Sequence, residues 1–375
     1  MISSLNFFNK KILYFILAIV TSAAGGHAFA GQEVSSGVAA ADFRLAVLPV
    51  NNLCGMNAPL RDIQRSLSTR LRALGVSVIA DDAVEGFLLH HRIRYTGGVD
   101  EKTAKALKEE IKADGVLISS LELYLSDTPP KIAMTTRLVT TSPLEIRWVE
   151  SVGLSGDDSP GILDLGLIND PKKLQENALS RLMDSFRDFF SVQGGIIRKS
   201  GADRAFRPKI AFVSPDLEKI RSRSVAIIPF RGERTRRHSG ELAQLHLIGQ
   251  LFGTGGIRII EPGIIRENML INRIIIPIGV SYRDLDIIGI PLNADIIVAG
   301  NIFDYLDYSG PLSVPKCDFS IMLLGVKDRE ILAASNSYNA GDEKVFFFNV
   351  GGVSTASALL DKMMLAAKVK IFGTR

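Results

Sequence analysis

The sequence of 375 residues has little of the chemistry on which most active sites depend. It contains two cysteines, five histidines and one tryptophan. No G-x-S-x-G nucleophile elbow occurs, and no set of Ser, His and Asp stands out. The shortage of reactive side chains predicts a protein that is not an enzyme and that needs no cofactor.

The few candidate residues are poorly placed for metal binding or catalysis. His90 and His91 are adjacent, whereas two metal ligands on one helix need a spacing of three or four residues. His238 and His246 are eight residues apart, and no carboxylate between them is placed as in the motif of a zinc protease. Cys54 has no basic neighbour in sequence, so a buried, inert thiol is expected there. We therefore predict no metal site and no catalytic cysteine.

Cysteine pairing and phosphate binding are also disfavoured. Cys54 and Cys317 lie in different halves of the chain at non-equivalent places, which favours two separate thiols, although a disulfide stays open. The run GTGG at Gly253–Gly256 follows a predicted helix and precedes a strand. A phosphate-binding loop has the opposite order, so this run indicates a helix stop.

Long apolar runs are missing except near the start of the chain. Lys10 and Lys11 precede the uncharged apolar run Ile12–Ala24, and Ala28 and Ala30 follow as an A-x-A cleavage site. This pattern is typical of a secretory signal peptide over residues 1–30. An uncleaved membrane anchor is the alternative, but a helix that spans a bilayer needs roughly 20 apolar residues.

Export follows from this interpretation. We expect cleavage after Ala30 and a periplasmic protein, with a peripheral position at the outer membrane as a variant of that location. No cysteine lies at the cleavage point, so no lipid anchor is expected. No later run of 18 uncharged apolar residues occurs, so the chain after cleavage is predicted to have no transmembrane helix.

An internal repeat is the strongest positive feature of the sequence. The matched segments are Arg44–Val50 with Ser224–Phe230, Leu74–Ala80 with Gly255–Glu261, Ala113–Ser119 with Ala294–Gly300, and Gly156 with Gly341. Their offset drifts only from 180 to 185 residues, as short loop insertions would cause. The pattern predicts two tandem copies of one domain.

Each copy shows the same order of predicted elements. A short apolar strand, typical of a buried parallel strand, is followed by an amphipathic helix, a strand, two short helices, three strands and a closing helix. The expected fold class is α/β with a mixed sheet, β-α-β-α-α-β-β-β-α in each copy. The predicted bounds are 44–190 and 224–371, with a basic linker over 191–223. Asp114 and Asp295 recur at the start of the third strand, where a structural hydrogen-bonding role is expected.

Positive charge is concentrated in the middle of the chain. The segment 191–223 carries eight Lys and Arg against three Asp and Glu, and the loop 231–237 reads RGERTRR. The equivalent loop of the first copy, Asn51–Pro59, has no charge, so the fold does not require the arginines. A solvated loop is one interpretation, and weak binding to an anionic membrane surface is the other. The candidate residues are Arg231, Arg234, Arg236 and Arg237. Nucleic acid is not an expected partner of an exported protein.

The motifs resemble those of a group of cell-envelope domains. LPVNN at Leu48–Asn52, LRALGVSVI at Leu71–Ile79 and NADIIVAG at Asn293–Gly300 are similar to motifs of the TolB amino-terminal domain. The curli-secretion protein CsgG and the lipoprotein activator of penicillin-binding proteins share that domain type. The resemblance covers most of both halves, with Ser119 and the loop after Phe230 as departures. It implies a non-catalytic domain, present twice, that binds other envelope proteins.

The expected function is therefore a protein-interaction module that is accessory to an outer-membrane or secretion assembly. Two alternatives stay open, namely a periplasmic solute-binding protein with two lobes and an envelope hydrolase with an unrecognised site. A two-lobed solute-binding protein needs chain crossovers between its lobes, whereas these copies follow one another along the chain.

Overall fold

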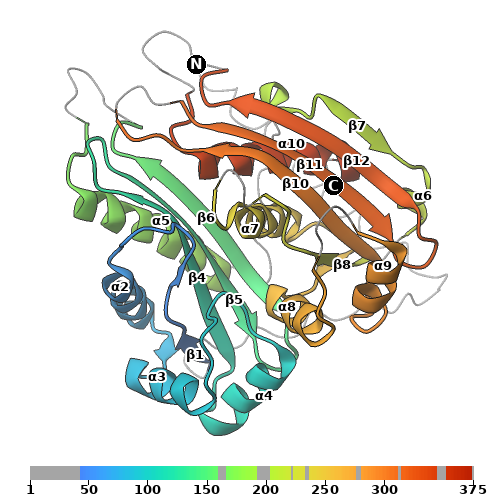
Figure 1. Ribbon diagram of the computed structural model, residues 1–375. Coiled ribbons are helices and arrows are strands. Elements are labelled where there is room, and N and C mark those ends of the chain that lie inside the picture. Colours follow the sequence, from blue (N-terminus) through green and yellow to red (C-terminus); the bar gives the residue numbers. More distant parts are fainter. Residues whose placement is uncertain are drawn as a thin grey trace, which may run out of the picture. The chain divides into compact units, whose positions relative to one another are not determined.

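The computed structural model describes residues 43–158, 166–191, 203–220, 223–232, 236–275, 280–310, 314–343 and 352–373. The predicted fold class is confirmed, because two mixed sheets with covering helices make up these residues (Figure 1). Both copies belong to one compact unit. The predicted signal peptide lies outside the described residues, and so do the first residues after its cleavage point.

The first half follows the predicted order. Its elements are β1 (Arg44–Val47), β2 (Asn51–Asn52), α2 (Leu60–Ala73), β3 (Ser77–Val78), α3 (Asp81–His90), α4 (Glu101–Glu110), β4 (Gly115–Leu125), β5 (Lys131–Thr140), β6 (Ile146–Ser155) and α5 (Pro171–Ser191). β1 lies parallel to β3 and β4, and β4, β5 and β6 form an antiparallel meander. The strand order is β3-β1-β4-β5-β6, with β2 beside β4.

The second half repeats this topology with one addition. Its elements are η2 (Arg204–Phe206), β7 (Ile210–Val213), α6 (Asp216–Lys219), β8 (Arg223–Ile227), α7 (Ser239–Leu251), β9 (Ile257–Ile259), α8 (Pro262–Ile271), α9 (Tyr282–Gly289), β10 (Ile296–Leu306), β11 (Lys316–Gly325), β12 (Ile331–Ala340) and α10 (Ala356–Phe372). The strand order is β7-β12-β11-β10-β8-β9. β7 pairs antiparallel with β12, so the segment predicted as a linker contributes a strand to the second sheet. The domain boundaries themselves stay a prediction.

Equivalent hydrogen bonds show the repeat at atomic detail. The Arg44 amide donates to Asp114 Oδ2 at 2.9 Å, and the Ser224 amide donates to Asp295 Oδ2 at 2.7 Å. Each carboxylate thus joins the start of the third strand to the start of the first strand. The structural role predicted for the two aspartates is confirmed.

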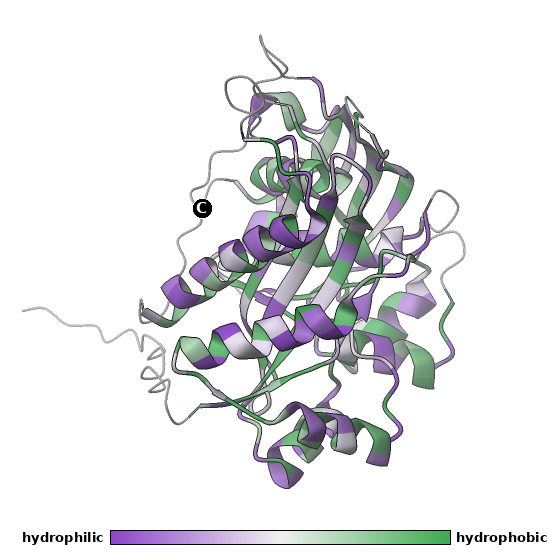
Figure 2. Ribbon diagram, turned by 90° about the vertical axis from the view of Figure 1, so that its left-hand side faces the viewer, coloured by the Kyte–Doolittle hydropathy of each residue, from purple (hydrophilic) through white to green (hydrophobic). Residues whose placement is uncertain are grey.

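The helices of the two halves differ in how much of their surface is buried. Ile63, Leu67 and Leu71 form one buried stripe on α2, which ends at Gly75 with a φ of +82°. The outward side of α2 is charged, and Figure 2 shows hydrophilic residues on the helices at that side. In α7, by contrast, every residue except Glu241 is buried. A helix that is apolar on all sides must be covered on all sides.

The layers of the molecule explain this difference. α2 and α5 cover one face of the first sheet. α7 and α10 lie between the two sheets and contact both, while α3 and α4 cover the rest of the inner face of the first sheet (Figure 1). α8 and α9 cover one end of the outer face of the second sheet. One hydrophobic core therefore runs from Ile118 of β4 through Leu247 and Leu359 of α7 and α10 to Phe319 of β11.

Gly156 and Gly341 occupy equivalent turns where no side chain fits. The amides of Ile168 and Val353 each donate to the carbonyl oxygen of the glycine at 2.9 Å. A Cβ atom on Gly156 would lie 2.0 Å from the carbonyl oxygen of Ile168, and one on Gly341 would lie 2.2 Å from that of Val353. The close approach of two backbones therefore requires glycine in both halves.

We predict that Gly156→Ala and Gly341→Ala each lower the free energy of unfolding by about 1–3 kcal/mol, because the backbone must shift to admit the methyl group. Urea denaturation of the full chain measures the change. Gly86→Ala is the matched control, since a Cβ there meets nothing within 4 Å. Gly86 lies in α3, where alanine should leave the stability unchanged or raise it slightly. Equal losses in all three variants would contradict the prediction.

Candidate functional site

Polar side chains are concentrated where the two halves meet. The face of the first sheet that α7 and α10 cover carries Ser120, Glu122, Thr135, Arg137 and Ser151. Buried polar groups need hydrogen-bonding partners, and buried charges need counter-charges. We call this region the junction, and its polar residues are the strongest candidates for a functional site.

Arg137 and Glu261 form a buried ion pair across the junction. Arg137 Nε lies 3.1 Å from Glu261 Oε2, and Arg137 Nη2 lies 2.7 Å from Glu261 Oε1. Arg137 Nη2 also donates to the Gly97 carbonyl oxygen at 2.6 Å. The two side chains are 1% and 0% exposed, so the pair is removed from water. Two parallel hydrogen bonds fix both the distance and the orientation of β5 against the start of α8.

The backbones of the two halves touch next to this pair. A Cβ atom on Gly263 would lie 2.3 Å from the Val99 amide nitrogen, and one on Gly98 would lie 2.8 Å from the Gly263 nitrogen. The Val99 amide also donates to Glu261 Oε1 at 3.4 Å. The loop before α4 and the first turn of α8 are therefore held in direct contact.

A second polar cluster surrounds His246 of α7. Nε2 of the ring lies 3.0 Å from Glu122 Oε2 and 3.2 Å from Ser357 Oγ, and Nδ1 lies 3.3 Å from Asp361 Oδ1. Glu122 comes from β4 of the first half, whereas Ser357 and Asp361 lie on α10. The order Ser–His–Asp is that of a hydrolase triad, so its chemistry has to be tested against the charge state of the histidine.

The charges around His246 favour its protonated form. Burial by itself lowers the pKa of His246, but the charge of Glu122 and the hydrogen bonds of Asp361 and Glu122 raise it to about 10. Burial raises the pKa of Glu122, and the neighbouring imidazolium lowers it below its usual value. An imidazolium donates from both nitrogens and cannot accept the proton of Ser357. The cluster is therefore an ion pair that joins the halves, with the geometry of a triad but not its chemistry.

A hollow of about 280 Å³ opens beside this cluster and includes His246, Ser357 and Asp361 in its lining. His246 and Ser357 are almost completely buried, so the hollow presents little of either to a substrate.

Arg236 from the predicted basic loop belongs to the same junction. Its guanidinium lies 4.8 Å from the centroid of the Tyr305 ring and 3.6 Å from Asp307 Oδ2, and it donates to the Glu122 carbonyl oxygen. The side chain is only 16% exposed. The Arg236 side chain thus packs within the junction and leaves little of its guanidinium for an anionic surface, while the role predicted for it there stays a prediction.

The other arginines of the loop have different positions. Arg231 and Arg237 are exposed, and Arg234 lies outside the described residues. The role predicted for these three residues at an anionic surface stays a prediction.

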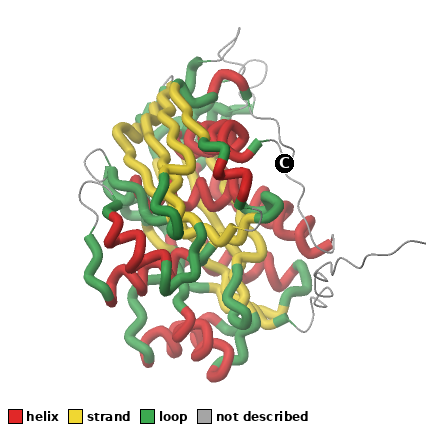
Figure 3. Tube along the Cα trace, turned by 90° about the vertical axis from the view of Figure 1, so that its right-hand side faces the viewer, coloured by secondary structure: helices red, strands yellow, loops and turns green. Residues whose placement is uncertain are grey.

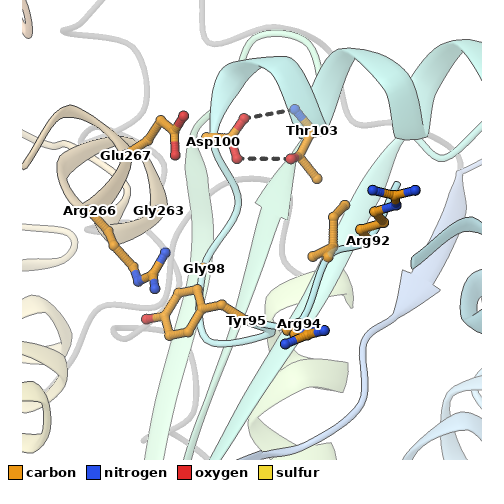
Figure 4. A pocket seen from close by; sticks show the side chains of 10 residues that line it. Arg92, Arg94, Tyr95, Gly98, Asp100, Thr103, Gly263, Arg266 and Glu267 are labelled. Atoms are coloured by element: carbon orange, nitrogen blue, oxygen red, sulfur yellow. Dashed lines mark hydrogen bonds between the residues drawn. The ribbon is translucent and has the colours of Figure 1, made fainter. Parts of the chain in front are cut away.

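A pocket of about 270 Å³ lies next to the contact of Gly98 with Gly263 (Figure 4). Its lining includes Arg92, Arg94, Tyr95, Asp100 and Thr103 from the first half, and Arg266 and Glu267 from the second. The Arg266 guanidinium lies 4.1 Å from the Tyr95 ring centroid, and Figure 4 shows the two side by side. Asp100 accepts hydrogen bonds from the Thr103 amide and hydroxyl, both at 2.8 Å, and so caps α4. The volume is below the roughly 300–1,000 Å³ of typical small-molecule sites.

The cysteine predictions are confirmed in part. Cys54 and Cys317 are both free, so the expectation of two separate thiols is confirmed. Cys317 is buried as expected, and burial raises the pKa of its thiol. The same expectation is wrong for Cys54, which is half-buried because the loop after β2 lies at the surface. Its Sγ lies 2.9 Å from Asn52 Oδ1.

Metal and membrane features were searched in the residues that the structure describes. No group of three or more His, Cys, Asp or Glu side chains there could hold a metal ion. None of the helices in the described ranges has the length and apolar composition that crossing a bilayer requires.

Sequence reasoning missed most of the junction. Glu122 and Arg137 are each the only charged residue in an otherwise uncharged stretch of a strand, LISSLELYL and IAMTTRLVT. A charged residue inside a strand that is expected to be buried indicates a buried partner, so this signal was present in the sequence. Glu261 and Asp361 gave no such signal, because they lie where exposed carboxylates are common.

Comparisons with known proteins give structural likeness only. No protein-family model matches the sequence, and no curated protein matches it either. Among solved structures, the chain is similar to the PelC dodecamer from Paraburkholderia phytofirmans, with 16% identity, a TM-score of 0.28, and coverage of 42% of this chain and 96% of that one. The lipoprotein GNA1162 from Neisseria meningitidis gives 18% identity, a TM-score of 0.29, and coverage of 38% and 97%. The C-terminal domain of LpoB from Salmonella enterica gives 18% identity, a TM-score of 0.27, and coverage of 32% and 87%. The resemblance to the TolB amino-terminal group stays a prediction.

Breaking the ion pair between Arg137 and Glu261 should be costly. We predict that Glu261→Gln lowers the free energy of unfolding by about 3–5 kcal/mol, because the guanidinium is left buried without a counter-charge. Replacing both residues, with Arg137→Met and Glu261→Leu, should recover most of the loss, because a buried ion pair can often be replaced by apolar residues of similar volume at little cost. Chemical denaturation measures both variants. Arg147→Gln is the control, because its pair with Glu145 is about 40% exposed and should contribute less than about 1 kcal/mol.

The charge state of His246 predicts how stability depends on pH. Its pKa is about 10 in the folded chain and 6.5 in the unfolded chain, so its contribution is complete below pH 6.5 and is lost as the pH rises toward about 10. We predict that the free energy of unfolding falls across this range and that His246→Gln flattens the slope. His90→Gln, on the exposed side of α3, should keep it. A slope that is unchanged in His246→Gln would show that the imidazolium is not the cause.

Vesicle binding tests the exposed arginines. We predict that the mature chain sediments with anionic vesicles at low salt, and that the triple change of Arg231, Arg234 and Arg237 to Gln weakens binding by about 1 kcal/mol for each cation. Arg236→Gln should keep vesicle binding and instead lower stability, because this side chain is buried in the junction. If the triple variant binds as well as the original chain, or if neither binds, the loop is only solvated.

Proposed function

We propose that this chain is an exported, non-enzymatic protein of the cell envelope that acts by binding other envelope proteins, as an accessory module of an outer-membrane or secretion assembly. One observation supports the proposal above others, namely that the buried charged groups are used to hold the halves together. Glu122 with His246, and Arg137 with Glu261, each join one half to the other. Groups fixed in this way are unsuited to the changes of charge that catalysis needs.

The junction also argues against a two-lobed solute-binding protein. Such a protein needs lobes that can open and close around a cleft. Here one hydrophobic core includes Ile118 and Val149 of the first half together with Leu247 and Leu359 of the second. Opening the halves would expose that core and the buried ion pairs. The two halves therefore behave as one body in this proposal.

The hydrolase alternative has one observation in its favour, the Ser–His–Asp order of Ser357, His246 and Asp361. The same geometry weakens it, because Glu122 holds Nε2 of the ring and keeps the histidine charged. A serine hydroxyl next to an imidazolium lacks the base that would activate it. Binding of proteins is consequently the function that the molecule supports best.

Export and envelope location remain part of the proposal. They rest on the predicted signal peptide over residues 1–30 and on the resemblance to envelope domains. A protein that binds others in the periplasm needs a stable scaffold and an accessible surface, and the second sheet offers such a surface. Phe212, Phe303, Met322 and Tyr338 are exposed on its strands. Large exposed apolar side chains that are grouped together are typical of interaction sites.

The proposal is tested with the mature chain, residues 31–375, as an affinity bait. The bait is cross-linked in envelope fractions of the source organism, and quantitative mass spectrometry compares the captured proteins with those of a bait unfolded before coupling. Enrichment of a defined envelope assembly by the folded bait alone is the expected result. In parallel, a fluorophosphonate probe tests for an activated serine. Labelling that disappears in Ser357→Ala would overturn the non-enzymatic assignment.

A further inference from the structure

Among the residues that the structure describes, helices cover only one end of the outer face of the second sheet. Three rows of cross-strand neighbours make up this face, namely Ala299, Met322, Ala334 and Phe212; Asn301, Ser320, Asn336 and Ile210; and Asp304, Asp318 and Tyr338. Of these, Ile210, Phe212, Met322 and Tyr338 are exposed. α8 and α9 cover only the end of the face near Ile297 and Leu324. In Figure 3 strands of the second sheet lie at the surface in the upper part of the view.

The equivalent face of the first sheet is fully used. There the same register positions carry Arg137 in place of Met322 and Gly153 in place of Tyr338. Gly97 and Glu261 contact Arg137, and the start of α10 lies against Gly153. Phe303 holds the bulge position that Glu122 holds in β4. Elements of the second half thus cover this face of the first sheet, whereas within the described residues only α8 and α9 cover part of the equivalent face of the second sheet.

A second copy of this chain cannot repeat the internal packing on this face. The helices equivalent to α7 and α10 that it would present are α2 and α5, and both carry charged residues on their outward sides. In the first half, Gly153 lets α10 approach closely, because a Cβ there would lie 2.7 Å from Thr355 Oγ1. Tyr338 fills that space in the second half. A repeat of the internal packing between two molecules is therefore blocked.

Two carboxylates face each other on this sheet face, and the mostly polar row of Asn301, Ser320 and Asn336 separates them from the apolar row of Met322 and Phe212. Asp304 and Asp318 are direct cross-strand partners, and like charges in that arrangement destabilise a sheet. Burial and the charge of Asp304 raise the pKa of Asp318. Within the residues that the structure describes, neither carboxylate has an ion pair. A cation placed between them would relieve the repulsion, whereas an anionic membrane surface would increase it.

We propose that the outer face of the second sheet is the docking site for an amphipathic helix of a partner protein, whose apolar side carries a Lys or Arg that is placed between Asp304 and Asp318. The apolar rows around Phe212 and Met322 receive the apolar side of that helix. The acidic pair selects its register, as a buried charge pair does within an interface. This inference rests on the proposed function, because it names the kind of partner and the surface that receives it.

The test places a photo-reactive phenylalanine analogue at Tyr338 in the full chain within the envelope, with the same analogue at Arg65 on α2 as the control. The cross-linked segment is mapped by mass spectrometry. The expected result is a product from Tyr338 alone, in a helical amphipathic segment that contains Lys or Arg. A synthetic peptide of that segment should bind the chain roughly tenfold more weakly after Asp304→Asn with Asp318→Asn, or after its own Lys or Arg is changed to Glu.

Several outcomes would overturn the proposal. Cross-links to lipid, to a second copy of the chain or to a segment without a basic residue would each do so, and so would the absence of any product. The double Asn variant should be at least as stable as the original, because it removes a repulsion, so a loss of binding cannot be assigned to unfolding. If the original chain and the double Asn variant capture the same envelope proteins to the same extent, the docking site is not on this face, but the proposed function stands. If neither captures any, the proposed function fails as well.

Discussion

The burial of α7 and α10 between two sheets is the constraint on which the rest of this molecule depends. Both helices are apolar around most of their surface, and they would expose large apolar areas if either sheet were removed. Burial of such area is the dominant favourable contribution to folding, at roughly 25 cal/mol for each Å². The second half therefore depends on the first sheet, although its own topology is complete.

Hydrophobic packing alone would allow the layers to slide, and the charged pairs restrict that freedom. Arg137 with Glu261 fixes one end of the junction, and Glu122 with His246 fixes the middle. A buried pair contributes little net stability compared with apolar residues, but removing one partner is costly. The pairs therefore act mainly on specificity, by allowing only one arrangement of the two halves.

The two copies share a fold but present different surfaces. The first sheet has polar residues and a glycine where the covering helices approach, whereas the second sheet has Phe303, Met322 and Tyr338 at the equivalent places. A smaller difference has the same origin. Gly300 leaves room for the Phe230 ring, because a Cβ atom on Gly300 would lie only 2.4 Å from that ring. At the equivalent positions the first half has Ser119 and Val50, and the smaller Val50 leaves room for the serine side chain. Differences of this kind give two copies of one domain separate structural roles.

The sequence by itself determined most elements of each half and their order, although β7 lies in the segment predicted as a linker. Apolar periodicity and turn residues are local signals, so α2, its end at Gly75 and the meander after Asp114 could be predicted with their bounds nearly correct. Only the tertiary structure decided how the halves join. Glu261 and Asp361 meet Arg137 and His246 from more than 100 residues away, and no local pattern encodes such a contact. The same holds for Arg236, whose sequence context suggests a solvated loop, because burial depends on what the rest of the chain places around it.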